Sequence, residues 1–295
     1  MKVRMYNVGF GDCFCLRDRK KSLLVDFGTN NSRIEGRPRR EIFDVIISDL
    51  STIKSKNLLL THFHMDHLSG LLYMMKKKDI SVDFGKIYLP DVFSKKEMSR
   101  TLVLLLLADL LKESGLPSRQ VSLFALVDAL LENKQNVELL SRGKLFENKY
   151  QALWPDTDVI RKETDEVYNR ICEDGKFKEV MDVLLEFAEK LRLIVWSMTA
   201  EGNKPAETVE KETDLTASEL TEQPEVRQKI IRAYVYEREF RRIKALPDFK
   251  KLLAWLNENQ INLRQFKHKI SIVFQNGQRR RIKSFCLPGM HSLSI

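Results

Sequence analysis

The stretch Leu58–Gly70, LLLTHFHMDHLSG, holds three of the chain's five histidines within six residues. The apolar run at its start is typical of a short buried strand, which places the histidines on the loop at the strand's end. His62 and His64 are two residues apart, so both rings can point to one side of an extended segment. Asp66 and His67 follow where a helix is expected to begin. Imidazole nitrogens with a carboxylate are ligands for zinc, or for iron or manganese when oxygen ligands are added.

Two further motifs precede this loop. Val8–Asp12 reads VGFGD, and Leu24–Gly28 reads LVDFG. Together with the histidine loop they resemble, in the same order, the GxGD, DxG and HxHxDH motifs of the metallo-β-lactamase superfamily. The sequence is most similar to the hydrolase domain of bacterial DNA-uptake channel proteins and its stand-alone relatives. A polar loop that is rich in histidine by chance is the alternative, but this spacing after a buried strand is far more specific than a lone pair of histidines.

The resemblance implies an α/β fold, an αβ/βα four-layer sandwich with large helical insertions. We expect a single metallo-β-lactamase-like domain over residues 1–295. Its core is assigned to 1–95, 137–159 and 262–295, and its helical insertions to 96–136 and 160–261. The insertions carry no motif of the family. Their Leu- and Ala-rich segments have wide apolar faces, which favour packing over a cofactor or membrane role.

Hydrophobic periodicity and turn residues predict the order of the elements. The predicted strands are 1–8, 13–17, 22–27, 58–60, 84–89, 149–154 (returning to the core sheet), 270–275 and 281–287. The predicted helices are 41–50, 68–77, 102–112, 123–132, 180–193, 225–245 and 249–258, with a flexible linker over 202–223.

The resemblance assigns His62 and His64 to a first metal ion, and Asp66 and His67 to a second. Asp66 is also the candidate to orient a water molecule or take up a proton. Zinc is the expected metal, with manganese or iron as alternatives. Two ions are implied by the family, and one is the alternative for this chain.

Asp12 and Asp26 are candidates for a supporting role. Carboxylates beside metal-binding histidines hold the ring N–H groups and fix their tautomers. For Asp26, a purely structural role in the turn is an equal alternative.

The end of the chain departs from the family's pattern. Ser284–Gly289 arrives where the family has a late Gly-Asp, but Met290 stands in place of the Asp that bridges the metals. A thioether is a poor ligand for a hard, charged metal pair. His268 and His291 are candidate additional ligands, each with the alternative of an ordinary surface or strand residue. A truncated chain and a divergent one-metal or inactive protein both fit this ending.

Charge and composition indicate which kinds of partner to expect. The formal net charge is +9, and residues 261–283 carry seven Lys or Arg and no acid. A basic C-terminal third favours nucleic acid or another phosphate-rich substrate, while a solvated helix face with a charged edge strand is the equal alternative. The longest apolar run, Leu102–Leu107, is too short to span a bilayer, so no membrane partner is expected.

The N-terminus has no apolar signal segment, and the four cysteines form no CxxC pair, so we expect a cytoplasmic protein with reduced thiols. A β-lactam substrate is not expected for such a chain. The leading hypothesis is a metal-dependent hydrolase that uses a metal-activated water on a phosphodiester or nucleic-acid substrate. The alternative is a catalytically impaired or truncated protein of the same fold that acts through protein–protein contacts of its helical insertions.

Overall fold

A computed structural model describes residues 1–18, 21–77, 83–112, 122–173, 175–202, 242–259, 261 and 263–276. The strands are β1 (Lys2–Met5), β2 (Phe14–Asp18), β3 (Lys21–Val25), β4 (Arg33–Ile34), β5 (Arg37–Pro38), β6 (Ser55–Leu59), β7 (Ile87–Pro90), β8 (Val137–Leu140), β9 (Leu145–Phe146), β10 (Tyr150–Trp154) and β11 (Val273–Asn276). The helices are α1 (Arg39–Ser51), α2 (Met65–Lys76), the 3-10 turn η1 (Lys96–Met98), α3 (Ser99–Lys112), α4 (Ser122–Glu132), α5 (Thr157–Cys172), α6 (Lys178–Ser197), α11 (Phe249–Glu258) and α12 (Arg264–Lys269).

A six-stranded mixed sheet forms the centre, in the order β1-β2-β3-β6-β7-β8. The first three strands are antiparallel, and β3, β6, β7 and β8 are parallel. Val25 pairs with Leu59, so the chain leaves β3 and β6 at the same edge of the sheet. The residues after these two strands therefore lie side by side, although they are more than thirty positions apart in the sequence.

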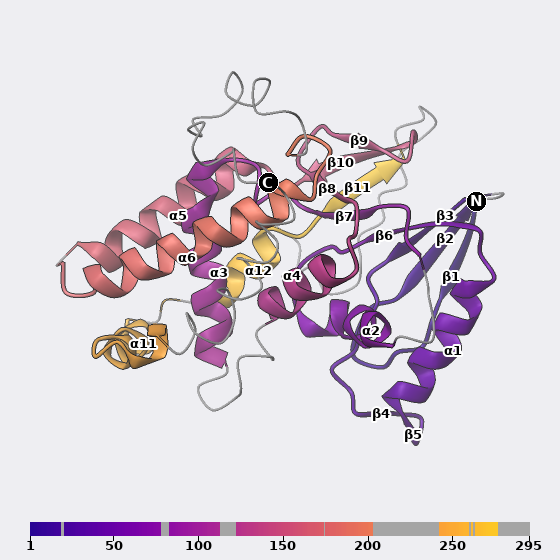
Figure 1. The fold of residues 1–295 in the computed structure, drawn as a ribbon, viewed down its shortest axis with the longest axis horizontal. Helices are drawn as coiled ribbons and strands as arrows, with labels where there is room; N and C mark the ends of the chain where they lie inside the picture. The colour runs from indigo at the N-terminus through magenta and orange to yellow at the C-terminus, as the bar shows by residue number, and fades with distance from the viewer. Residues whose placement is uncertain are drawn as a thin grey trace.

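Both faces of the sheet are buried where β6 ends, as the apolar run Leu58–Leu60 predicts. Leu58 and Leu60 lie in the core that faces the helices, while Leu59 points to the opposite face, where it packs in a core with residues of β9, β10 and β11. Figure 1 shows the small sheet β11-β10-β9 above the large one, with α1, α2 and α4 below it. The α/β class is confirmed, and these layers are consistent with the metallo-β-lactamase type of sandwich.

The remaining helices form a second packed region, at the left of Figure 1. Leu102–Leu107 of α3 are all at most 1% exposed, because α3 is surrounded by α5, α6 and α12. The expectation that these segments pack is confirmed. Together α3 and α4 also form the crossover that joins the parallel strands β7 and β8. The division of the chain into core and insertions stays a prediction.

Two local predictions are wrong. The segment 149–154 forms β10, which pairs with β11 and β9 in the small sheet rather than returning to the large one. The strand predicted from residue 270 begins only at Val273, because the N–H groups of residues 270 and 271 bond back to α12 and that of Ile272 bonds to Thr61. The return strand 281–287 and most of the linker and basic helix over 202–245 lie outside the described residues. In the described part of the chain, no helix combines the length and apolar character needed to cross a membrane.

The glycines of the two early motifs allow three backbone segments to meet. A Cβ on Gly11 would overlap the backbone of Gly28. A Cβ on Gly28 would lie 2.6 Å from the backbone nitrogen of Leu68 and 2.7 Å from the carbonyl oxygen of Asp66. Only glycine permits the first turn of α2 to lie this close to the strand-end loop.

Gly28→Ala should therefore lower the free energy of unfolding by about 3 kcal/mol, because the atoms that a Cβ would meet are backbone and cannot move aside cheaply. Gly36→Ala is the matched control, because Gly36 has a φ of 78° but no atom within 4 Å of an added Cβ. It should cost only about 1–2 kcal/mol, the strain of a left-handed conformation. Urea denaturation measures both, and an equal or smaller loss for Gly28→Ala would contradict this account.

Candidate metal centre

The histidine loop lies at the edge of the large sheet where β3 and β6 end. His62 and His64 follow β6, Asp66 and His67 lie in the first turn of α2, and His268 comes from α12. The first turn of α2 is held to the segment after β3, because the backbone N–H of Phe27 donates to the carbonyl of His67 at 2.7 Å. One loop and one distant helix thus place four histidines in one small region.

Three of these histidines form a cluster of nitrogen atoms. His62, His64 and His268 each offer one ring nitrogen, and these nitrogens all lie within 4.8 Å of one another. Nε2 of His62 and Nδ1 of His64 are only 3.0 Å apart. Two nitrogens bound tetrahedrally to zinc at about 2.0–2.1 Å would be roughly 3.4 Å apart, so a shift of a few tenths of an ångström would suit both for one ion.

A second group adjoins the first. Asp12, Asp26 and His67 bring ligand atoms within 4.8 Å of one another, and the rings of His62 and His67 have centroids 3.9 Å apart. Nδ1 of His67 lies 2.9 Å from Asp26 and 3.6 Å from Asp12. The carboxylates therefore both approach the same ring nitrogen of His67, which leaves Nε2 as the atom available for a metal.

Asp26 is the organising residue of this second group. Its side chain is 0% exposed and its φ is 55°, a left-handed conformation at the end of β3. One carboxylate oxygen accepts from the backbone N–H of Thr61 at 2.7 Å, and the other accepts from the Thr61 hydroxyl at 2.7 Å while facing His67. Because both oxygens are already engaged, Asp26 acts here by orienting His67 and the loop after β6.

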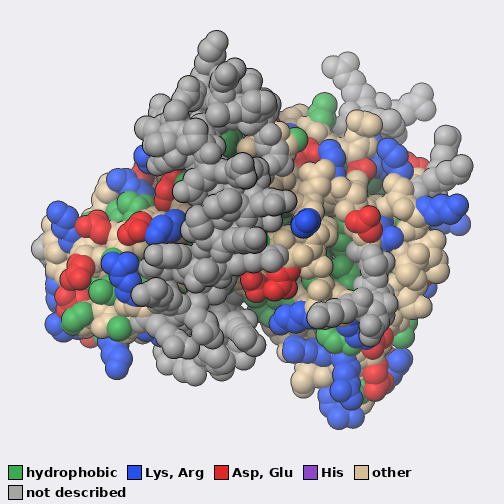
Figure 2. Space-filling model, in the orientation of Figure 1, with side chains coloured by type: hydrophobic (Ala, Val, Ile, Leu, Met, Phe, Trp, Pro, Cys, Tyr) green, Lys and Arg blue, Asp and Glu red, His purple; other side chains and the backbone are tan. Residues whose placement is uncertain are grey.

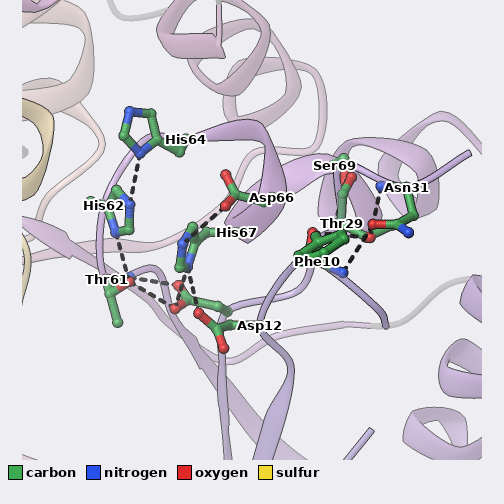
Figure 3. A network of polar contacts seen from close by, with 11 residues as sticks. Phe10, Asp12, Thr29, Asn31, Thr61, His62, His64, Asp66, His67 and Ser69 are labelled. Atoms are coloured by element: carbon green, nitrogen blue, oxygen red, sulfur yellow. Dashed lines mark hydrogen bonds and ion pairs between the residues drawn. The ribbon is translucent and has the colours of Figure 1, made fainter. Parts of the chain in front are cut away.

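Asp66 lies on the other side of His67. Figure 3 shows Asp66 and Asp12 on opposite sides of the ring, and the Asp66 carboxylate is 3.7 Å from Nε2 of His67. Its side chain is 30% exposed, so it also meets solvent. Asp66 belongs to neither group of three clustered ligands. It is placed beside the histidines rather than among them, which suits proton transfer as well as ligation.

The pKa values of His62 and His268 shift in the opposite direction to that of His67. Burial lowers the pKa of His62 well below its usual range, and the neighbouring histidines and Lys267 lower it further. Burial, with the nearby His67, also lowers the pKa of His268. These rings are neutral at physiological pH, which is the form that binds metals.

His67 differs from them. Burial acts to lower the pKa of His67, but the charge and hydrogen bond of Asp26, with Asp66 and Asp12, raise it above the usual value. Burial also raises the pKa of Asp12; the charge of His67 opposes this shift, while the negative charges of Asp26 and Asp66 add to it. His67 therefore holds a proton more readily than His62 or His268 does.

The donor set of the first cluster fits zinc. Three neutral imidazoles are a known ligand set of catalytic zinc sites, in which water or substrate takes the fourth position. The Thr61 hydroxyl lies 3.0 Å from Nδ1 of His62, and this contact orients the ring so that Nε2 faces His64. The second cluster fits less well, because the oxygens of Asp26 are already used.

A hydrogen-bonded network supports the site from the side of the VGFGD motif (Figure 3). Ser69 of α2 accepts from the backbone N–H of Thr29 at 2.9 Å and donates to its carbonyl oxygen at 2.9 Å. The Thr29 hydroxyl in turn donates to the carbonyl of Phe10, whose N–H donates to Asn31. These bonds fasten the loop that carries Asp12 to the helix that carries His67.

The sequence motifs identified most of these residues as candidates for the site, but not all of them. Thr61 was missed, although it contacts both Asp26 and His62, because its role depends on the pairing of β3 with β6. The structure brings His268 into the histidine cluster, and His291 and Met290 lie outside the described residues. The metal-binding roles themselves stay predictions.

Residues 6–91 match the family model described as metallo-beta-lactamase superfamily. The matched region includes the VGFGD, LVDFG and histidine-loop motifs, and ends at Asp91, directly after β7. No curated protein and no solved structure matches the chain. The similarity to DNA-uptake hydrolases therefore stays a prediction.

Asp26→Asn should lower the pKa of His67, because it removes the charge that most favours the imidazolium. NMR titration of the histidine ring protons in metal-free protein measures this value. In the unmodified protein, His67 should titrate above about 6.5, and His62 and His268 below it.

Asp44→Asn is the matched control, because Asp44 pairs with Tyr73 and Lys77 rather than with a histidine. It should leave the titration of His67 unchanged. An unmodified protein in which His67 titrates below His62, or an Asp26→Asn variant with no change at His67, would contradict the assigned contacts.

Proposed function

We propose that the chain is a metal-dependent hydrolase whose principal metal ion is held by His62, His64 and His268. The observation that carries this proposal is the clustering of their three ring nitrogens within 4.8 Å, at the end of a buried strand. Two of these residues lie within the region that matches the metallo-beta-lactamase superfamily, and the third reaches the cluster from α12. Zinc is the ion that three imidazoles favour.

A bound zinc ion lowers the pKa of water towards neutrality and polarises a carbonyl or phosphoryl oxygen. Asp66, partly exposed beside the cluster, takes up the proton released from the attacking water. His67 donates Nδ1–H to Asp26, which fixes its tautomer and directs Nε2 towards Asp66. The burial of His62 keeps its ring neutral and available as a ligand.

We further propose that the first ion is bound more tightly than any second ion. The Asp26 oxygens already accept from Thr61 and His67, so a second ion would depend chiefly on His67 Nε2, Asp66 and Asp12. Both of these carboxylates, Asp12 and Asp66, also contact solvent. A site of this kind is weaker than three converging imidazoles, which supports one tightly held ion per chain.

The proposed substrate class is a phosphodiester, with nucleic acid as one source. The formal net charge of +9 favours a polyanionic partner. Figure 2 shows Lys and Arg side chains gathered at the lower right, where Figure 1 places β4 and β5. Exposed arginines of that hairpin and the start of α1 contribute to this surface; they are Arg33, Arg37, Arg39 and Arg40.

The test is hydrolysis by zinc-loaded protein of three chromogenic substrates: bis(p-nitrophenyl) phosphate, a thioester and a β-lactam. We expect turnover of the phosphodiester alone. His64→Ala should abolish it by removing a ligand. Asp66→Asn should lower kcat by about 10²–10⁴-fold while the bound zinc is retained, because it removes a proton acceptor and not a ligand of the three-histidine cluster.

Asp158→Asn is the matched control, because it removes an exposed carboxylate whose ion-pair partner among the described residues is Lys95, at 3.7 Å. It should leave kcat unchanged. A preference for the thioester or lactam would contradict the substrate class. If zinc-loaded, folded protein hydrolyses none of the three, the enzyme proposal fails, and the alternative of a catalytically impaired protein that acts through its helical part is favoured.

A further inference from the structure

A charged cluster lies buried among the helices beside the histidines. Lys267, Asp109 and Ser122 are only 4%, 3% and 2% exposed. Lys267 forms an ion pair with Asp109 and donates to the Ser122 hydroxyl at 3.1 Å. The same hydroxyl donates to the Asp109 carboxylate at 2.9 Å. The three residues come from α12, α3 and α4, so this one cluster joins three helices.

Burying such a cluster between helices has a cost in desolvation free energy. A buried ion pair loses the hydration of both charges, and well-packed apolar residues often stabilise a fold as well or better. What a buried pair provides is geometry, because its hydrogen bonds are satisfied in one arrangement only. The cluster is therefore suited to fixing the position of α12 rather than to adding stability.

The position of α12 matters because the next residue is His268. Successive side chains of a helix diverge by about 100°, so one can face α3 and α4 while its neighbour faces the metal loop. Helix α12 has only six residues, too few to be stable by itself. Its placement is set by contacts with its surroundings.

We propose that Lys267, Asp109 and Ser122 are positioning residues that hold α12 in the register that brings His268 to His62 and His64. The inference rests on the proposed metal site and adds that the helical part of the chain supplies its third ligand. Metal binding and the packing of α12 on α3 are then energetically coupled.

Other contacts of α12 provide the comparison. Lys269 pairs with Glu163 of α5, and both side chains are more than a third exposed. After the helix, the N–H of Ile272 donates to the carbonyl of Thr61 at 2.8 Å, which ties the segment to the metal loop itself. The Glu163 pair is a surface contact that should contribute little to the placement of His268.

The test is a double-mutant cycle with Co²⁺ as the probe, followed by its visible absorption on titration into metal-free, full-length protein. His268→Ala and Asp109→Ala should each weaken Co²⁺ binding by about 10–100-fold. In the His268→Ala background, Asp109→Ala should change the affinity by less than about twofold, because its effect acts through His268. Glu163→Ala, which removes a carboxylate that contacts the same helix, is the matched control and should have no effect.

Circular dichroism checks that each variant folds. If Asp109→Ala does not fold, Ser122→Ala takes its place in the cycle, with an expected loss of about threefold, because it removes the hydrogen bonds of the hydroxyl but leaves the ion pair of Lys267 with Asp109. Equal losses in both backgrounds, or no loss in either, would overturn the positioning role. If His268→Ala binds Co²⁺ as tightly as the unmodified protein, this inference fails while a site at His62 and His64 stands. Folded, unmodified protein without any Co²⁺ binding would overturn the proposed function as well.

Discussion

The site depends on the buried carboxylate of Asp26. It accepts two hydrogen bonds from Thr61 and faces Nδ1 of His67, so it links the ends of β3 and β6 to the first turn of α2. A buried charge of this kind is tolerated only when its oxygens are fully paired. The hydrogen bonds of Asp26 therefore fix the loop after β6 and, through Thr61, the orientation of the His62 ring. Glycines at 11 and 28 allow the backbones to approach closely enough for these bonds to form.

A second constraint comes from far along the chain. The three-nitrogen cluster is complete only with His268, which follows α3, α4, α5 and α6 in the sequence. The helical part of the chain therefore supplies one of the three clustered histidines. It packs around α3, and α3 anchors α12 through the buried pair of Asp109 and Lys267. The region that matches the metallo-beta-lactamase superfamily ends at residue 91, so this part of the site lies beyond it.

Local sequence patterns were sufficient to predict much of the metal loop and the elements beside it. The apolar strand, the HxHxDH loop and the start of α2 could be predicted because their spacing is read within a dozen residues. The roles of Thr61 and Lys267 could not, since each depends on contacts between segments distant in the sequence. For the same reason β10 was assigned to the wrong sheet: its partner β11 lies more than a hundred residues later. His268 was named as a candidate from its place before a strand, but the helix that carries it was not.

The proposed function requires three histidines to bind one metal ion tightly. Its most direct test is elemental analysis of the purified, full-length protein beside a His62→Ala variant whose fold has been checked by circular dichroism. We expect close to one ion of zinc per chain in the unmodified protein and almost none in the variant. No metal in folded, unmodified protein supplied with zinc, or the same content in both proteins, would contradict it.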